Sequence, residues 1–372
     1  MNTQNALFSL LISFQLFTSE NPILLTPENL DQYQELVDKL GQSVRRLART
    51  AYVISITPNS KYVSDTQLKK SEERTDSLIP VLDEMGLETR LIDAATPLDV
   101  DPESWQKLQE IYQDKEFFNR QDWPQQIDER IGTKEQKYWR RADNWSRKVP
   151  GQNYKVLDPK SGIYQLACAE SHIKTLKQAL REAQFSDKHP LILEDDANFA
   201  VSREIINRFN QAISDLEKRQ WTYFKLGLSF WKENAAVNPM QIGWQETECL
   251  TKLLGSQGTF AEIINRNELP RVCTTYEQYL AGVKSDPSSV IYADDVIQRQ
   301  QELAGESPTY ATNPTIVGQG HAYSTLCEKV MDYNQDAGLL RHGLICKYPT
   351  QELMKRRPDG FCEYIGSELK NS

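Results

Sequence analysis

Two apolar runs separated by a polar stretch restrict the fold of this chain more than any other feature. Residues Ala51–Ile56 read "AYVISI", a β-branched run closed by Thr57-Pro58-Asn59, which predicts a buried strand followed by a turn. The next segment, "TQLKKSEERTDSLIPVLDEMG", predicts a helix that ends at Gly86, and Leu87–Ala95 predicts a second strand. A strand, a helix and a strand with short joints form a βαβ unit with parallel strands and a right-handed crossover. We therefore expect an α/β fold.

The same alternation continues along the chain and sets the expected domain limits. A helix is predicted over Thr26–Arg49 within an N-terminal helical segment (residues 1–50), and another over Ser161–Gln184. We expect one α/β domain over residues 51–330 and a C-terminal extension over residues 331–372. Residues 97–160 break the pattern and contain four of the seven tryptophans. This Trp-rich insertion either packs a small core of its own or forms a lid that faces the substrate.

The composition excludes some classes of function. The chain has 372 residues and a formal net charge of -9, so it has no general attraction for nucleic acid. Its six cysteines form no CxxC pair, which leaves a zinc ribbon unsupported, and Cys168 lies among alanines, as a small buried side chain would. The apolar segment Ala6–Phe17 fits either a signal peptide or a helix packed on the domain. We expect a cytoplasmic protein, with the secretory pathway and membrane association left open.

The segment "LILEDDANFA" places three carboxylates, Glu194, Asp195 and Asp196, after an apolar run. In an open α/β sheet, ligands bind beyond the carboxyl ends of the strands. Strand alternation would direct Glu194 and Asp196 to one side and Asp195 to the other. Two carboxylates on one side suit Mn²⁺ or Mg²⁺. Alternatively, Asp195 or Asp196 caps a following helix, or all three side chains face water.

Two further features are candidates for the chemistry. Asp294 and Asp295 follow "SSVIYA" and form either a second acidic site or the N-terminus of a helix. His172 lies in an apolar helix, where it serves either as a core residue or as a catalyst. The sequence contains no GxSxG, Walker A or GxGxxG motif, so hydrolase, P-loop and dinucleotide-binding functions lack their usual support.

Taken in order, these segments resemble glycosyltransferase family 25, the group of lipopolysaccharide glycosyltransferases and procollagen galactosyltransferases. The resemblance covers roughly residues 51–324. It departs from the family pattern at Ala167, where glycine is expected, and at Phe260, where histidine is common. The matching segments are "YVISI", "SEERTDSLIPVLDEMGLETRLIDAA", "IYQLACAESHIKTLKQAL", "PLILEDDANF", "GSQGTFAEIINR", "YADDVIQRQ" and "NPTIVGQG".

The resemblance implies a GT-A-type fold, a Rossmann-like mixed sheet flanked by helices that binds a nucleotide sugar with Mn²⁺ or Mg²⁺. Glu194-Asp195-Asp196 would be its Asp-x-Asp-type motif at the donor site, with Asp196 holding the metal on the diphosphate and Glu194 either assisting or reaching the ribose. Arg74 and His172 would lie near the donor phosphates, and Asp294 or Asp295 would deprotonate the acceptor hydroxyl. The nucleotide pocket would be lined by Val53, Ile54 and Ser55.

The function implied is a metal-dependent transfer of a hexose, with galactose from UDP-galactose as the first candidate, to a glycan or hydroxyl acceptor. A catalytically degenerate glycosyltransferase-like binding protein is the alternative, suggested by Ala167 and Phe260. A phosphotransfer protein is a third class, although "EDDANFA" lacks the Asp-x-Asp-x-Thr order of one such group.

Overall fold

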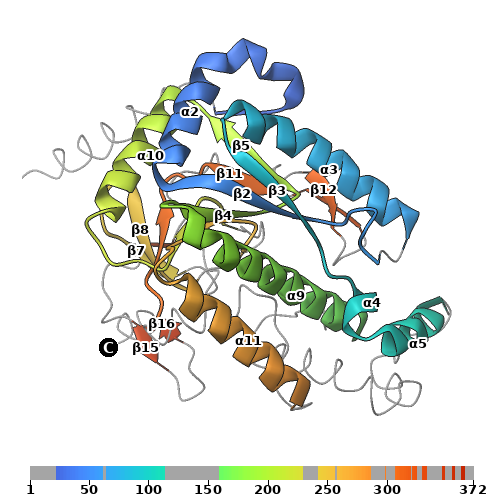
Figure 1. Cartoon of the computed structure of the whole chain (residues 1–372). Helices are drawn as coiled ribbons and strands as arrows, with labels where there is room; N and C mark the ends of the chain where they lie inside the picture. Colours follow the sequence, from blue (N-terminus) through green and yellow to red (C-terminus); the bar gives the residue numbers. More distant parts are fainter. Residues whose placement is uncertain are drawn as a thin grey trace, which may run out of the picture.

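A nine-stranded mixed sheet forms the centre of the molecule (Figure 1). The computed structural model describes residues 22–61, 64–113, 159–228, 242–255, 258–285, 298, 306–319, 321–324, 329–332, 346–347, 354–356 and 362–364. The strands lie in the spatial order β14 (Cys346–Lys347), β7 (Ile242–Gln245), β8 (Leu250–Gly255), β10 (Thr309–Thr312), β6 (Tyr223–Lys225), β9 (Ala261–Ile264), β4 (His189–Glu194), β2 (Ala48–Ser55) and β3 (Glu88–Asp93).

The predicted βαβ unit is confirmed. Strand β2 pairs in parallel with both β3 and β4, and Val53 lies opposite Leu91 on one side and Leu193 on the other. Helix α3 (Asp65–Glu84) makes the crossover. It begins at the Ser64 cap, whose Oγ accepts from the backbone N of Gln67 at 3.3 Å. Gly86 follows its end with φ +71°, a left-handed conformation that glycine adopts without steric cost.

The rest of the sheet is mixed rather than all parallel. Strand β9 runs antiparallel to both β4 and β6, and β10 pairs in parallel with β6 but antiparallel with β8. The expected mixed sheet flanked by helices is therefore present, in an arrangement compatible with a Rossmann-like fold.

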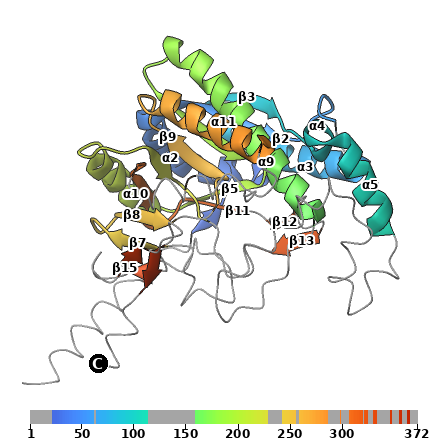
Figure 2. The same cartoon turned by 90° about the horizontal axis from the view of Figure 1, so that it is seen from below.

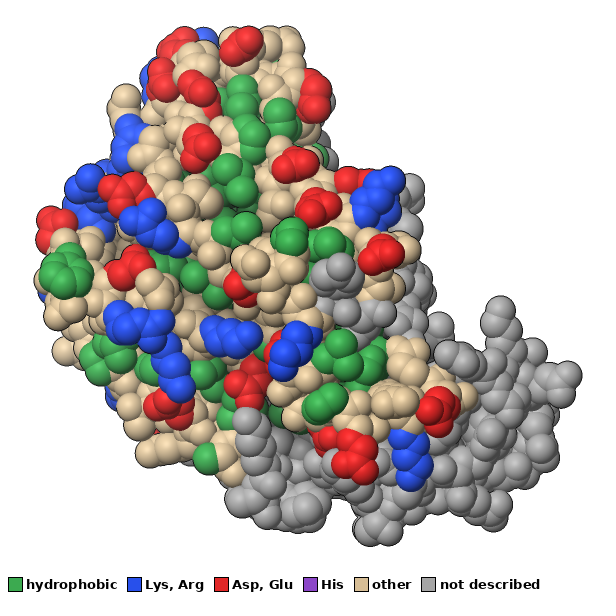
Figure 3. Space-filling view, turned by 45° about the vertical axis from the view of Figure 1, so that its right-hand side comes forward, with side chains coloured by type: hydrophobic (Ala, Val, Ile, Leu, Met, Phe, Trp, Pro, Cys, Tyr) green, Lys and Arg blue, Asp and Glu red, His purple; other side chains and the backbone are tan. Residues whose placement is uncertain are grey.

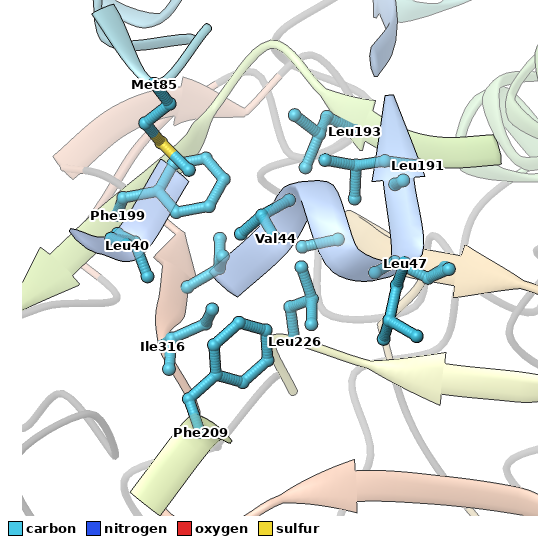
Figure 4. Close-up of a cluster of buried hydrophobic side chains, with 14 of the residues drawn as sticks. Leu40, Val44, Leu47, Met85, Leu191, Leu193, Phe199, Phe209, Leu226 and Ile316 are labelled. Atoms are coloured by element: carbon cyan, nitrogen blue, oxygen red, sulfur yellow. The ribbon is translucent and has the colours of Figure 1, made fainter. Parts of the chain in front are cut away.

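Helices cover both faces of this sheet and bury a hydrophobic cluster on each. Helices α2 (Gln34–Leu47), α3 and α10 (Arg203–Leu216) enclose the first cluster, which includes Leu191 and Leu193 of β4 (Figure 4). Helices α5 (Pro102–Gln113), α9 (Pro159–Glu182) and α11 (Leu269–Ser285) enclose the second, which includes Ile192. Figures 1 and 2 show α9 and α11 side by side on this second face. Because side chains alternate along β4, each face receives every second residue.

The predicted helix over Thr26–Arg49 is wrong at both ends. Two 3₁₀ turns, η1 (Pro27–Asn29) and η2 (Asp31–Tyr33), precede α2, and β2 already begins at Ala48. The backbone N of Thr26 donates to Oδ1 of Asn29 at 3.0 Å, which closes the first turn as a separate capped unit. Tertiary pairing of residue 48 with His189 of β4 extends the strand at the helix's expense.

The expected insertion is described only in part. Thr96 precedes the short helix α4 (Pro97–Val100), and α5 follows directly. Trp105 of α5 is buried and packs edge-to-face on Tyr164 of α9, with ring centroids 5.1 Å apart. Residue 105 therefore belongs to the second cluster. The other three tryptophans of the insertion lie outside the described residues.

Four smaller features complete the architecture of the described residues. A second sheet joins β1 (Ile23–Leu24), β5 (Ala197–Val201) and β11 (Val317–Gln319), and the 3₁₀ turn η3 (Ala183–Phe185) follows α9. Two further antiparallel pairs join β12 (His321–Ser324) with β13 (Lys329–Asp332), and β15 (Met354–Arg356) with β16 (Cys362–Tyr364).

The surface of the described chain carries no dominant charge of one sign on the face in Figure 3, where acidic and basic side chains are interspersed. Among the described residues, every helix is too short or too polar to cross a bilayer.

Candidate functional site

The three consecutive carboxylates lie where the chain leaves the main sheet. Strand β4 ends at Glu194, residues 195 and 196 form a turn, and β5 begins at Ala197 in the second sheet. We call Glu194, Asp195 and Asp196 the acidic turn. The alternative that Asp195 or Asp196 caps a helix is wrong, because a strand follows. The next helix, α10, has its own cap in Ser202, whose Oγ accepts from the backbone N of Ile205 at 3.2 Å.

Asp195 points toward α3 and is saturated with partners. Arg74 reaches it with two nitrogens, Nε at 2.9 Å from Oδ1 and Nη2 at 3.1 Å from Oδ2. Ser55 Oγ donates to Oδ2 at 2.9 Å, and the hydroxyl of Ser71 bonds the same oxygen. The side chains of Arg74 and Asp195 are only 15% and 10% exposed. Asp195 is thus part of a buried, charge-assisted network.

Ser71 is a site residue that the sequence analysis missed. Its Oγ also accepts from the backbone N of Ile56 at 2.9 Å and lies 2.7 Å from Ser55 Oγ. Ser71 and Arg74 are three residues apart on α3, so both face the end of β2. The serine of the "SEER" segment is Ser71, but a single serine is too common in sequences to indicate a site.

Glu194 points the other way, toward α9. Its Oε1 lies 3.3 Å from Nε2 of His172, and Thr259 Oγ1 donates to the same oxygen at 3.4 Å. His172 is 1% exposed, so both sequence interpretations of this residue capture part of its setting: it is buried, and it contacts the acidic turn. The opposite directions predicted for Glu194 and Asp195 are confirmed. Strand β4 ends at Glu194, and the side of the strand predicted for Asp196 stays a prediction.

Cys168 lies one helical turn before His172 on α9. The thiol of Cys168, the imidazole of His172 and the carboxylate of Glu194 place their donor atoms within 4.8 Å of one another. The prediction of a simple buried side chain at Cys168 is wrong, since this residue is partly exposed. The adjacent Ser171 fixes this part of α9: its Oγ accepts from Ala95 N at 2.8 Å and donates to Ala167 O at 2.8 Å.

Asp196 has the most unusual electrostatics of the acidic turn. Burial, together with the negative charges of Glu194 and Asp195, raises the pKa of Asp196 to about 7, although Arg74 opposes the shift. Burial alone would lower the pKa of Arg74, but the charges of Asp195, Asp196 and Glu194 outweigh burial and raise it. Arg74 is therefore held as a cation amid three carboxylates. An additional cation at Asp196 would be attracted by the same field.

The residues predicted for the nucleotide pocket divide between core and site. Val53 and Ile54 are buried in opposite hydrophobic clusters, whereas Ser55 contacts Asp195. Asp294 and Asp295, predicted to deprotonate the acceptor, lie outside the described residues. The structure thus brings together the following predicted residues: Ser55, Arg74, His172, Glu194, Asp195 and Asp196.

A second buried polar network lies on β9 and β6, the two strands next to β4 in the sheet. Lys225 of β6 and Glu262 of β9 are 0% and 1% exposed, and Lys225 Nζ lies 3.3 Å from Glu262 Oε2. Lys225 Nζ also donates to the carbonyl of Gly258 at 2.8 Å, and Gln298 Nε2 donates to Glu262 Oε1 at 2.7 Å. Since Gly258 immediately precedes Thr259, this network fixes the loop that contacts Glu194.

No protein-family model and no curated protein matches this chain. The resemblance to glycosyltransferase family 25 therefore rests on the ordered motifs alone.

Proposed function

We propose that the protein is a metal-dependent glycosyltransferase of GT-A type, related to family 25. It would transfer a hexose, with galactose from UDP-galactose as the first candidate, to a glycan or other hydroxyl acceptor. The observation that carries this proposal is the convergence on the acidic turn of residues from separate motifs. Ser55 ends strand β2, Arg74 belongs to the Glu-Arg helix, and His172 belongs to the Ser-His helix.

The electrostatics of the acidic turn favour a bound cation. Glu194 and Asp196 offer the carboxylate oxygens that Mn²⁺ and Mg²⁺ prefer, and burial together with the negative charges of Glu194 and Asp195 raises the pKa of Asp196. These two residues would hold the ion, which when bound would neutralise charge on a diphosphate leaving group. Asp195 has a different role: its partners Arg74, Ser55 and Ser71 hold the turn in place.

The side chains at the two departures from the family pattern are buried in the core, and the Phe260 carbonyl accepts from the backbone N of Glu194 at 2.9 Å. Ala167 is 3% exposed and Phe260 is 1% exposed. A Cβ added at Gly227 would lie 2.5 Å from the Phe260 ring, so glycine at 227 provides the space for this phenyl group. Both departures are consistent with changes in packing, which weakens the argument for a degenerate site.

The acceptor step requires a base that the described residues do not identify. A direct displacement needs a carboxylate near the acceptor hydroxyl to accept its proton. Asp294 and Asp295 remain our candidates for this role, on the basis of the motif resemblance.

The test is a thermal-shift panel of UDP, GDP and CMP sugars, each with and without Mn²⁺, followed by an assay of donor hydrolysis. One nucleotide sugar is expected to raise the melting temperature only when Mn²⁺ is present, because a ligand stabilises the folded state that binds it. Asp196→Asn should abolish both the metal-dependent shift and hydrolysis. Asp187→Asn is the matched control, since it changes an exposed aspartate before β4.

Three outcomes have distinct meanings. A shift with hydrolysis supports a transferase, whereas a metal-dependent shift without hydrolysis or transfer supports the binding-protein alternative. If no nucleotide sugar binds, or if Asp196→Asn binds and hydrolyses as well as Asp187→Asn, the proposed function is wrong.

A further inference from the structure

The α9 side of the acidic turn has a donor set that shares Glu194 with the proposed transferase but adds the thiol of Cys168, which has no role in the proposed transfer. Cys168 and His172 are four residues apart on α9, so their side chains lie on the same face of the helix, one turn apart. Glu194 approaches this face from the end of β4. The set thus combines a thiol, an imidazole and a carboxylate from two elements of the rigid core.

The spacing of these donors matches the dimensions of a tetrahedral metal site. Two nitrogen or oxygen ligands about 2.0 Å from a tetrahedral ion lie roughly 3.3 Å from each other. The distance between His172 Nε2 and Glu194 Oε1 is 3.3 Å. The donor atoms of all three residues lie within 4.8 Å, which exceeds the roughly 3.5 Å expected between sulfur and nitrogen ligands by little more than one ångström. A small side-chain adjustment closes that difference.

The chemistry of the donors separates this cluster from the proposed diphosphate site. Thiolate and imidazole favour Zn²⁺, whereas Mn²⁺ and Mg²⁺ favour carboxylates, carbonyls and water. The contacts with His172 and Thr259 use only Oε1 of Glu194. Glu194 therefore faces the sulfur- and nitrogen-containing set with one oxygen.

The surroundings are those of a prearranged site. The side chains of His172 and Glu194 are 2% and 27% exposed. Ser171, beside His172, ties α9 to Ala95 at the end of β3, and Thr259 contacts the Glu194 oxygen. Such neighbours orient metal ligands before the ion arrives.

We propose that Cys168, His172 and Glu194 form a three-ligand site for a borderline-soft divalent ion of the Zn²⁺ type. On binding, a sulfur–metal bond replaces the S–H bond, and the thiol proton passes to solvent. Three protein ligands leave the fourth tetrahedral position for water or another ligand. This site shares Glu194 with the proposed transferase, but it needs neither a nucleotide sugar nor Asp196.

The experiment uses the full chain, stripped with chelator and then titrated with Zn²⁺ and with Co²⁺. The expected result is one Zn²⁺ retained per chain after dialysis, and a sulfur-to-cobalt charge-transfer band in the near ultraviolet with Co²⁺. Cys168→Ser should abolish that band and lower the Zn²⁺ affinity at least about tenfold. The matched control is Cys273→Ser, which changes a buried cysteine on the neighbouring α11.

A second variant separates this site from the proposed transferase. Asp196→Asn should leave the cobalt band unchanged, even if it abolishes any response to Mn²⁺ and nucleotide sugar. Failure of the natural chain to retain Zn²⁺, or a cobalt band that persists in Cys168→Ser, would overturn the proposal. Zn²⁺ retention is measured on the natural chain, so this measurement tests the proposal even if a variant fails to fold.

Discussion

Each side of the acidic turn carries one carboxylate, but the groups that contact this carboxylate and balance its negative charge differ between the two sides. On the α3 side, Arg74 neutralises the charge of Asp195, and the hydroxyl groups of Ser55 and Ser71 donate hydrogen bonds to it. On the α9 side, Glu194 meets a histidine and a threonine at 3.3 and 3.4 Å. Asp196 between them has its pKa raised to about 7. The comparison indicates that one side anchors the turn, whereas the other retains capacity for a ligand.

The largest expected effect on stability comes from a substitution on the α3 side, where Asp195 anchors the acidic turn. Asp195→Asn leaves the buried guanidinium of Arg74 without its nearest carboxylate, so we expect a loss of about 3 kcal/mol in the free energy of unfolding. Urea denaturation at pH 7.5 with chelator measures it. The control is Glu217→Gln, which removes the exposed pair between Arg46 Nη2 and Glu217 Oε2 at 3.1 Å and should cost less than about 1 kcal/mol. Equal losses in the two variants would show that the Asp195 network is no anchor.

The next effect has the opposite sign, although it concerns the adjacent residue. Because the folded chain raises the pKa of Asp196 from 3.8 to about 7, it binds this proton more tightly than the unfolded chain does. The contribution is therefore stabilising at pH below 3.8 and is lost as the pH rises to about 7.

Asp196→Asn removes this pH-dependent loss. Without metal, the variant should be more stable than the natural chain by about 2 kcal/mol at pH 8, roughly half the value of the full shift because the residue is partly exposed. The two chains should differ little near pH 4. Urea titrations at both pH values make the comparison, and a variant less stable at pH 8 would contradict the assignment.

A smaller effect tests the hydroxyl groups around Asp195. Ser71→Ala removes the bond to Asp195 and leaves Ile56 N without its acceptor at 2.9 Å, so we expect a cost of about 1–2 kcal/mol. Ser77→Ala is the control on the same helix, because the exposed Ser77 Oγ donates only to the Glu73 carbonyl at 3.1 Å. Thermal or urea unfolding that ranks the two variants equally would remove Ser71 from the anchor.

The smallest effect belongs to the α9 side. Thr259→Val removes a long 3.4 Å bond to Glu194, and we expect a change of about 0.5 kcal/mol in stability. A loss as large as that of Ser71→Ala would erase the difference between the two sides of the acidic turn.

Local patterns predicted the parts of this molecule that local physics decides. The run Ala51–Ile56 was apolar enough to identify β2, and the alternation in β4 gave opposite directions to Glu194 and Asp195. The conformation of the chain after the end of β4 could not be predicted from local patterns. Whether residues 195 and 196 start a helix or turn into β5 depends on pairing of β5 with β1 and β11, far away in sequence.

The partners of the acidic turn were equally hard to predict. Ser71, Thr259 and Cys168 have side chains that occur throughout most sequences, and only the three-dimensional fold brings them to Asp195 and Glu194. Their distance along the chain from residue 194 leaves no periodic signal. Sequence order could suggest Arg74 and His172 through the resemblance, but not what each would contact.

The position of β5 has a consequence for synthesis of the protein. This strand leads directly away from the acidic turn, and its two neighbours are residues 23–24 and 317–319. During translation, β1 is made first, whereas β11 emerges more than one hundred residues after the turn itself. A ribosome-bound chain that stops before residue 317 therefore lacks one flank of β5, and the acidic turn reaches its final geometry only late in biosynthesis.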